Sequence, residues 1–523
     1  MTLEEKIIIT FSEQTDKNRK ILDSLKRSFA KKVSKGMVKN SQLLEAYHKL
    51  VKEKRIKKDL ETEHVLRIRK VRSLSGIVIV SVLTKPYPCP GKCIYCPQQD
   101  GAPKSYLREE PAVARAIKCN YQPYKQTQVR IKALEATGHP TDKIDLRIIG
   151  ATWSFYPKNY QTWFIKRCFK AANDYPKNKK GAKTLEKLQK ENEKAKHRII
   201  GVTIETRPDF IDIKEIKRLR KLGVTRVELG VQSVYNDILK INKRGHDIEQ
   251  TIKATKLLKD AGFKICYQMM PNLAGSDIKR DFEMFEQLFS NPNFKPDYLK
   301  IYPCALLKEA PLYSVYKKGN FKPYTEKQLI KLLIKIKKII PYWVRIQRII
   351  RDIPTSYIVE GGTKTSNLRQ MIAIMAKEQN WQCKCIRCRE VKENYDPKEK
   401  LKLFREDYKA SEGKEIFLSF ENENRTKLYS LLRLRIPSET ALPILKDSAI
   451  VRELHTYGQL VAISKKEKAA QHKGLGKKLM KEAEKIAKQE NRKQIAVISG
   501  VGVRGYYKKL GYGLKQTYMV KKT

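Results

Sequence analysis

The sequence is poor in acidic residues and has no long apolar run. Asp and Glu number 56 against 110 Lys and Arg, so the 523-residue chain carries a formal charge of +54. No stretch reaches the roughly 18 consecutive apolar residues that a membrane-spanning helix needs, and no basic segment leads into an apolar core at its start. These absences argue against a membrane protein and a secreted protein, and we expect a cytoplasmic one.

The scarcity of acid also predicts the kind of partner. The positive charge far exceeds what solubility requires, which indicates a polyanion and first of all a nucleic acid. Heat adaptation enriches lysine as well, but it normally enriches glutamate with it. With 41% hydrophobic residues, the chain is long enough to build two or more domains with cores of their own.

Cysteine is scarce too, and six of the ten cysteines fall into two groups of three. Cys89, Cys93 and Cys96 share the stretch KPYPCPGKCIYCPQQ. A disulfide framework suits short secreted chains, and structural zinc would lack a fourth ligand here. An iron-sulfur cube held by three thiolates leaves one iron open to a small molecule, so we favour that chemistry.

The second group, Cys383, Cys385 and Cys388, lies in the stretch WQCKCIRCREV between two differently patterned regions. We expect a structural zinc whose fourth ligand comes from elsewhere in the chain. Three reduced thiols in a turn are the alternative. The other four cysteines are expected to be small core residues.

Apolar patterning divides the chain into four parts. Residues 1–75 predict basic helices that dock tRNA, with an ordinary solvated helix face as the alternative. Residues 76–345 alternate short apolar runs with amphipathic helices, which is typical of parallel strands covered by helices. Residues 346–395 form a linker with the second cysteine group, and residues 396–523 form a separate domain.

The apolar runs of the second part are GIVIVSVL, DLRIIGAT, IIGVTIET, RVELGVQS, KICYQMMP and YLKIYP. In a β/α barrel, catalytic groups gather at the carboxyl ends of the strands. The loops after these runs, including the loop with Cys89, are therefore expected to surround one site. The charged stretch KGAKTLEKLQKENEKAKH interrupts the pattern, and we expect a solvated helix without chemistry there.

The last part carries a glycine loop before an amphipathic helix. In QHKGLGKKLMKEAEKIA, Gln471, Gly474 and Gly476 precede or open a helix whose free backbone N–H groups could hold a pyrophosphate. Two glycines alone are equally consistent with a simple turn. Further on, Tyr506 and Tyr507 in RGYYKKLGY could hydrogen-bond a thioester or pack against the final strand.

These motifs carry three resemblances. The order Cys-x3-Cys-x2-Cys resembles the signature of the radical S-adenosylmethionine enzymes, and VRELHTYG, the glycine loop and GYYKKLGY together resemble the GCN5-related N-acetyltransferases. The combination resembles the Elongator catalytic-subunit family in its stand-alone archaeal or bacterial form. Stretches that carry this likeness include CIYCP, TIETRPD, GVQSVY, MMPNL, LKIYP, LLRLR, RELH and AVISGVG.

The resemblance implies the fold and the cofactors. It implies an α/β chain with a partial TIM-type (β/α) barrel for a 4Fe-4S cluster and S-adenosylmethionine, followed by an acetyltransferase domain for acetyl-CoA. The expected basic helical N-terminal region and zinc-binding linker account for the rest of the chain. Many radical S-adenosylmethionine enzymes have a Gly-Gly-Glu turn after the second strand, whereas this chain reads IIGATWS, so cofactor contacts there must come from the backbone or from other residues.

The resemblance also implies site residues. Cys89, Cys93 and Cys96 would hold the cluster, and Lys143 would contact coenzyme A from the barrel domain. Lys300 is a weaker candidate for the radical site, and a solvated or salt-bridged lysine is an equal reading. Tyr506 and Tyr507 join Lys300 as catalytic candidates. The other implied coenzyme A contacts are Glu453, Leu454, His455, Thr456, Gln471, Gly474, Leu475, Gly476, Lys477 and Tyr507.

The reaction implied by the resemblance modifies the wobble uridine, position 34, of tRNA. A radical derived from S-adenosylmethionine would take a hydrogen from the methyl group of acetyl-CoA, and the product would be 5-carboxymethyluridine. The alternative is a protein lysine acetyltransferase with a structural iron-sulfur domain, but so positive a chain would repel histone-like tails. The expected partners are the tRNA anticodon stem-loop, an electron donor and a second copy of the chain.

Overall fold

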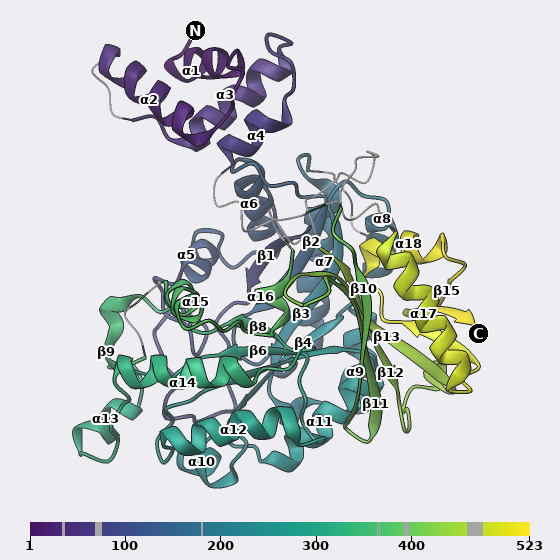
Figure 1. Ribbon diagram of the computed structural model, residues 1–523. Coiled ribbons are helices and arrows are strands. Elements are labelled where there is room, and N and C mark those ends of the chain that lie inside the picture. Colours follow the sequence, from purple (N-terminus) through teal and green to yellow (C-terminus); the bar gives the residue numbers. More distant parts are fainter. Residues whose placement is uncertain are drawn as a thin grey trace.

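The computed structural model describes most of the chain, and its elements follow one another in four groups (Figure 1). The described residues are 1–33, 37–67, 76–178, 181, 183–362, 365, 367–391, 396, 398–457 and 474–523.

Four helices at the N-terminus form a group of their own at one end of the molecule (Figure 1). Thr2 and Glu5 cap the first helix reciprocally, and the Asp59 side chain accepts hydrogen bonds from the first turn of the fourth. Apolar side chains at helical spacing, Phe11 and Tyr47 among them, build a core separate from the rest of the protein. The predicted helical N-terminal region is therefore confirmed. The helices are α1 (Leu3–Ser12), α2 (Arg19–Val33), α3 (Asn40–Lys52) and α4 (Leu60–Leu66).

A seven-stranded parallel sheet follows, with its strands in the order β1-β2-β3-β4-β5-β6-β8. Each of the six predicted apolar runs forms one of these strands, because runs buried on both faces suit parallel strands under helices. The sheet is an open part of a barrel, as expected. Its strands are β1 (Val78–Leu83), β2 (Lys143–Ile149), β3 (Arg198–Thr206), β4 (Arg226–Gln232), β5 (Lys264–Met269), β6 (Tyr298–Ile301) and β8 (Arg345–Arg348).

Helices connect these strands and cover the sheet (Figure 1). They are α5 (Pro111–Lys118), α6 (Pro123–Glu135), α7 (Lys158–Asp174), α8 (Leu185–Asn192), α9 (Ile213–Lys221), α10 (Asn236–Ile241), α11 (Ile248–Asp260), α12 (Ile278–Ser290), α13 (Leu312–Lys317) and α14 (Glu326–Ile339). A two-stranded sheet of β7 (Ala305–Leu307) and β9 (Ile358–Gly361) leads to the linker helices α15 (Leu368–Glu378) and α16 (Ile386–Arg389).

A second, mostly antiparallel sheet forms the C-terminal domain, with the order β10-β11-β12-β13-β14-β16-β15. The long helix α17 packs on β12 and β13. The elements are β10 (Lys402–Ala410), β11 (Gly413–Glu421), β12 (Leu428–Ile436), β13 (Ser448–Thr456), α17 (Leu475–Gln489), β14 (Gln494–Val497), α18 (Arg504–Lys508), β15 (Gly513–Lys515) and β16 (Tyr518–Lys522).

The two sheets belong to one continuous hydrophobic core. Ile450, Ile498 and Tyr518 of the C-terminal domain pack in the same cluster as Val227 and Ile265 of the parallel sheet. The C-terminal domain therefore does not hang on the barrel by a flexible linker, and the position of each domain is fixed by the packing of the other.

Buried ion pairs reinforce this junction. Arg433 and Arg435 stand two residues apart on β12 and so share one face of the strand. Arg435 contacts Asp260 of α11 at 2.6 Å and Glu415 of β11 at 3.0 Å. On β13, Arg452 donates to Asp297, directly before β6, and to Glu415.

Replacing Asp297 with asparagine is expected to destabilise the junction strongly. Asp297 is fully buried, and it accepts hydrogen bonds from Arg452 and from the backbone N–H of Ile265. The amide would remove the carboxylate that two buried arginines share, leaving Arg452 with Glu415 alone and Arg433 with Glu453 alone, so we expect a loss of about 3–5 kcal/mol in the free energy of unfolding at pH 7. Urea unfolding measures it, with Asp407→Asn in an exposed pair with Arg405 as control at about 1 kcal/mol or less.

The acid dependence of stability is a second readout for Asp297→Asn. Burial raises the pKa of Asp297, but Arg452 and Arg433 outweigh it and the net pKa is lowered. A carboxylate with a lowered pKa stabilises the fold above the unfolded value of about 3.9, and this stability is lost as the pH falls below it. The variant should lose less stability than the wild type below about pH 4. Equal losses at pH 7 for the two asparagine variants would contradict the assignment.

The charged stretch expected to be solvated is in contact with the C-terminal domain, so that prediction is wrong. It contains α8, whose Leu185 and Leu188 are buried, and Glu193 directly follows this helix. Glu193 pairs with Arg504 at 3.2 Å and with Lys508 at 2.9 Å. The excursion therefore helps to hold α18, and its charge had concealed a short apolar face.

Candidate active site

One cavity of about 1420 Å³ connects the first cysteine loop with the C-terminal domain. The predicted site residues that line it are Cys89, Cys93, Cys96, Lys143, Lys300, Glu453, Leu454, His455, Thr456, Gly474, Gly476, Lys477, Tyr506 and Tyr507. Leu475 is instead buried in an apolar cluster. Gln471 lies outside the described residues.

The loop after β1 places its thiols at one end of this cavity. A Cβ atom on Gly91 would lie 3.5 Å from the Cys93 sulfur and 3.7 Å from the Cys89 sulfur, so the two thiols flank this glycine. It would also lie 2.6 Å from a guanidinium nitrogen of Arg207. The Cys96 N–H donates to the Cys93 carbonyl in a turn that brings the third thiol to the same loop.

Two arginines beside this loop were not assigned a role from the sequence. Arg244 Nη1 lies 3.6 Å from the Cys93 sulfur, and Arg207 is held by Asp209 in a bidentate pair and by the Gly245 carbonyl. Burial raises the pKa of the Cys93 thiol, but Arg244, together with Tyr95 and Arg207, outweighs this effect and the net pKa is lowered. Arg207 belongs to TIETRPD, a stretch that carries the family resemblance and was the available signal for it, and Arg244 lies in the stretch NKRGH.

Lys300 lies in the interior of the parallel sheet. Its ammonium is 2.9 Å from Glu205 and also pairs closely with Glu228. Burial lowers the pKa of Lys300, but Glu228 and Glu205 outweigh it and the net pKa is raised. Lys300 is thus a salt-bridged lysine that still lines the cavity, and the Tyr106 hydroxyl donates to the same Glu205 at 2.9 Å.

Strand β13 opens away from its parallel neighbour at the other end of the cavity. The pairing of β13 with β14 covers Ser448 to Val451, whereas the pairing with β12 continues to Thr456. Of the strands that the structure describes, none pairs with residues 453–456 on the β14 side, so this stretch forms an opened edge that a bound chain could use. Gly474, at φ +67°, is the N-cap of α17, and a Cβ on Gly476 would lie 3.6 Å from the Thr456 hydroxyl, so the start of this helix borders the opened edge. The 15-residue helix directs its free N–H groups toward the opening.

The two adjacent tyrosines have different surroundings. Tyr507 is 6% exposed and belongs to the core of the C-terminal domain, next to Tyr512. Tyr506 is 40% exposed, and its hydroxyl lies 3.0 Å from where a Cβ on Gly476 would stand. Tyr506 therefore presents its hydroxyl to the glycine loop, while Tyr507 fixes the short helix α18.

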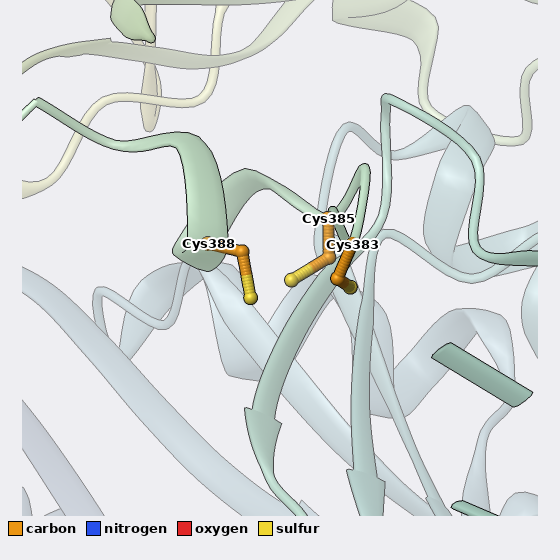
Figure 2. A group of neighbouring side chains, drawn as sticks. All are labelled: Cys383, Cys385 and Cys388. Atoms are coloured by element: carbon orange, nitrogen blue, oxygen red, sulfur yellow. The ribbon is translucent and has the colours of Figure 1, made fainter. Parts of the chain in front are cut away.

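The second cysteine group is the tightest set of metal-ligand types in the described ranges. The sulfur atoms of Cys383, Cys385 and Cys388 lie within 4.8 Å of one another, and Figure 2 shows them grouped where the linker enters α16. Cys383 and Cys385 are buried, and Lys337 Nζ is 3.5 Å from the Cys388 sulfur. Among the described residues, no His, Asp or Glu atom joins this set.

Comparison with known families identifies both domains that line the cavity. Residues 87–286 match a family model described as the Radical SAM superfamily, and residues 296–378 match the Radical_SAM C-terminal domain. Residues 395–512 match the acetyltransferase (GNAT) family. No helix in the described ranges is both long enough and apolar enough to cross a bilayer. The fold and site thus define a radical SAM protein with a fused GNAT domain.

Relatives over almost the whole chain narrow this class. A tRNA uridine(34) acetyltransferase of Methanocaldococcus infernus is 45% identical over 99% of this chain and 98% of its own length. Elongator complex protein 3 of Homo sapiens is 38% identical over 87% of this chain and 86% of its own length. A solved structure, the archaeal Methanocaldococcus infernus Elp3 with an N-terminal deletion, matches 86% of this chain and 100% of its own at a TM-score of 0.75 and 45% identity. The chain belongs to the family of the tRNA uridine(34) acetyltransferases and Elongator complex protein 3.

Proposed function

We propose that this protein modifies uridine 34 of tRNA with a carboxymethyl group derived from acetyl-CoA. The observation that carries the proposal is the single cavity that contains both the cysteine loop and the glycine loop. A conventional acetyltransferase has no need of an iron-sulfur loop that opens into its acetyl site. The names of the relatives support tRNA over a protein lysine as the acceptor.

The first cysteine loop suits a 4Fe-4S cluster in its donor set. Three free thiols without a disulfide line the cavity, and Arg244 and Arg207 supply positive charge beside the thiolates. With S-adenosylmethionine bound, such a cluster supplies a radical that can take a hydrogen atom from a methyl group. Arg244 lowers the pKa of the Cys93 thiol and so favours its thiolate form, and the Thr152 hydroxyl, 3.9 Å from the Cys89 sulfur, borders the same space.

The opened strand and the glycine loop suit acetyl-CoA. The opened edge of residues 453–456 can hydrogen-bond the pantetheine amides, and the N-terminus of α17 can hold the pyrophosphate together with Lys477. Lys143, whose pKa is lowered by burial, borders the cavity from the first position of β2 and suits the coenzyme phosphates. The Tyr506 hydroxyl is placed to hydrogen-bond the thioester beside Gly476.

The positive charge of the chain supports RNA as the partner. The net charge of +54 and the separate N-terminal helices suit the phosphates of the anticodon stem-loop, so the affinity should fall steeply with salt. A loop base can be turned out of its stack into a cavity that a paired base cannot enter. With tRNA as its substrate, the protein would act in the cytoplasm. The electron donor and a second copy of the chain stay predictions.

Cys383, Cys385 and Cys388 form our proposed zinc site. Three thiols within 4.8 Å suit a single tetrahedral ion better than the wider cysteine loop does. We expect about one zinc per chain by elemental analysis, and a chelator or Cys385→Ser should remove it and lower the unfolding temperature. Cys266→Ser, at a buried thiol elsewhere, is the control and should keep the metal. A wild-type chain purified without zinc would contradict the site.

The test of the function is an anaerobic reaction with unmodified tRNA, S-adenosylmethionine, a reductant and acetyl-CoA labelled in its methyl group. Nucleoside mass spectrometry should find the label in 5-carboxymethyluridine at position 34. Acetyl-lysine on a protein substrate, with no labelled uridine, would overturn the proposal in favour of a protein acetyltransferase.

A further inference from the structure

The interior of the parallel sheet is polar along its whole length. The cavity touches β5 at Lys264 and Gln268 and continues to Met270, so it follows this strand from its first residue to beyond its last. Six residues of strand span about 20 Å. Closed barrels of parallel strands are normally filled by branched apolar side chains. Here the interior is left open between the acetyltransferase end and the cysteine end.

Basic residues mark the end of this interior that faces the C-terminal domain. Five of the seven strands begin with a lysine or arginine, and all five side chains line the cavity. We call this set the amino-terminal rim: Lys143, Arg198, Arg226, Lys264 and Arg345. The amino end of such a sheet ordinarily serves stability, and the site lies at the carboxyl end. The charged and open amino end of this sheet therefore indicates a binding site for a ligand.

Several members of the rim have interaction partners within the fold, Lys143 among them. Arg226 pairs with Asp145 at 3.0 Å, and Arg345 pairs with Glu390 at 2.7 Å. In the described part of the chain, the Lys264 side chain makes no hydrogen bond or ion pair. Burial lowers the pKa of Lys264, with Glu453 as the main opposing charge. An oxygen acceptor in the cavity would relieve this ammonium.

Lys264 also lies where the acetyl site meets the rim. Glu453, the first residue of the opened edge of β13, accepts a close hydrogen bond from the Tyr298 hydroxyl. Tyr298 begins β6, which neighbours β5, and it lines the same cavity. A chain bound along the opened edge of β13 therefore reaches the sheet interior beside Lys264.

We propose that the amino-terminal rim admits the acyl end of the acetyl donor into the sheet interior, and that Lys264 donates a hydrogen bond to its carbonyl or carboxylate oxygen. The inference rests on the acetyl-CoA donor proposed above and adds the route by which the acyl group reaches the cysteine loop. The same ammonium would receive a thioester carbonyl or the carboxylate of released acetate. It would be a positioning contact to the two-carbon group.

Two coenzyme A thioethers test this contact without turnover. S-acetonyl-CoA and S-propyl-CoA have the same chain length and differ in one carbonyl oxygen. Calorimetry on the wild type should give about tenfold tighter binding of the ketone, the value of one charge-assisted hydrogen bond. Lys264→Met should bind both ligands equally, and Lys264→Arg should keep most of the preference. Lys253→Met, at an exposed lysine of α11, should behave as wild type.

The outcomes separate the inference from the function on which it rests. A Lys264→Met protein that binds S-propyl-CoA normally and still prefers the ketone tenfold would overturn the inference alone. A wild type that binds neither ligand would overturn the donor assignment and the inference with it. Line broadening of labelled acetate by wild type but not by Lys264→Met would assign the site to released acetate as well. Ketone preference without acetate binding would assign it to the thioester.

Discussion

Cys93→Ala is expected to remove the modified uridine, with at least a 100-fold loss of product, since altering groups that merely support a metal ligand already costs about 10–100-fold. Cys93 is the most buried thiol of its loop and the one that Arg244 contacts. Two remaining thiolates cannot hold a cube that needs three, so iron and sulfide should be lost together with the product. Nucleoside mass spectrometry measures the product, and elemental analysis measures the iron.

The control for this variant is Cys119→Ala. Cys119 is a buried thiol at the end of α5 and does not line the cavity. It should keep the iron content and most of the activity. Binding of coenzyme A should stay unchanged in both variants, because the glycine loop lies at the other end of the cavity. A Cys93→Ala protein that retains its iron and its product would refute the cluster assignment.

Gly500→Ala is expected to destabilise the protein more than alanine at any other described glycine. A Cβ at this position would stand 1.8 Å from the carbonyl oxygen of Ile200 in β3, where the C-terminal domain touches the backbone of the parallel sheet. Neither backbone can yield without moving a domain, so we expect a loss of at least about 3 kcal/mol and a loosened junction. Thermal unfolding and limited proteolysis should both report it.

Gly505→Ala provides the matched comparison. Gly505 lies five residues further on in α18, and a Cβ there would meet nothing within 4 Å. This variant should unfold like the wild type or slightly later, since alanine suits a helix better than glycine. Equal unfolding temperatures for the two variants would show that the domains separate more easily than their packing indicates.

The sequence allowed the parallel strands to be predicted because each is a continuous apolar run. It could not reveal the polar interior, because residues such as Lys264 and Arg226 stand at the first position of a strand and look like ordinary flanking charges. Basic residues recur at the start of several strands, and this recurrence was the available signal. It could not be distinguished from the general excess of positive charge in the chain. The opening of β13 depends on where pairing with β14 stops, and no local pattern encodes that.

The buried ion pairs were hidden for a related reason. Arg433 and Arg435 alternate with leucines in LLRLR, which marks one polar face of a strand. That face turned out to be covered by another domain, and only the fold identifies its partners. Similarly, α8 has a surface rich in lysine, and its contact through Glu193 depends on residues more than 300 positions away.

The shared core and its buried ion pairs restrict how such a protein can evolve or be rebuilt. A change at Asp297 or Arg452 alone would unbalance the buried charges of the junction, so we expect the two positions to change together. Recombination that exchanged the C-terminal half for that of a distant relative would combine charged residues that do not match at each of these buried ion pairs. We therefore expect the two halves to be inherited as a unit, and chimeras should need their junction residues transplanted along with the domain.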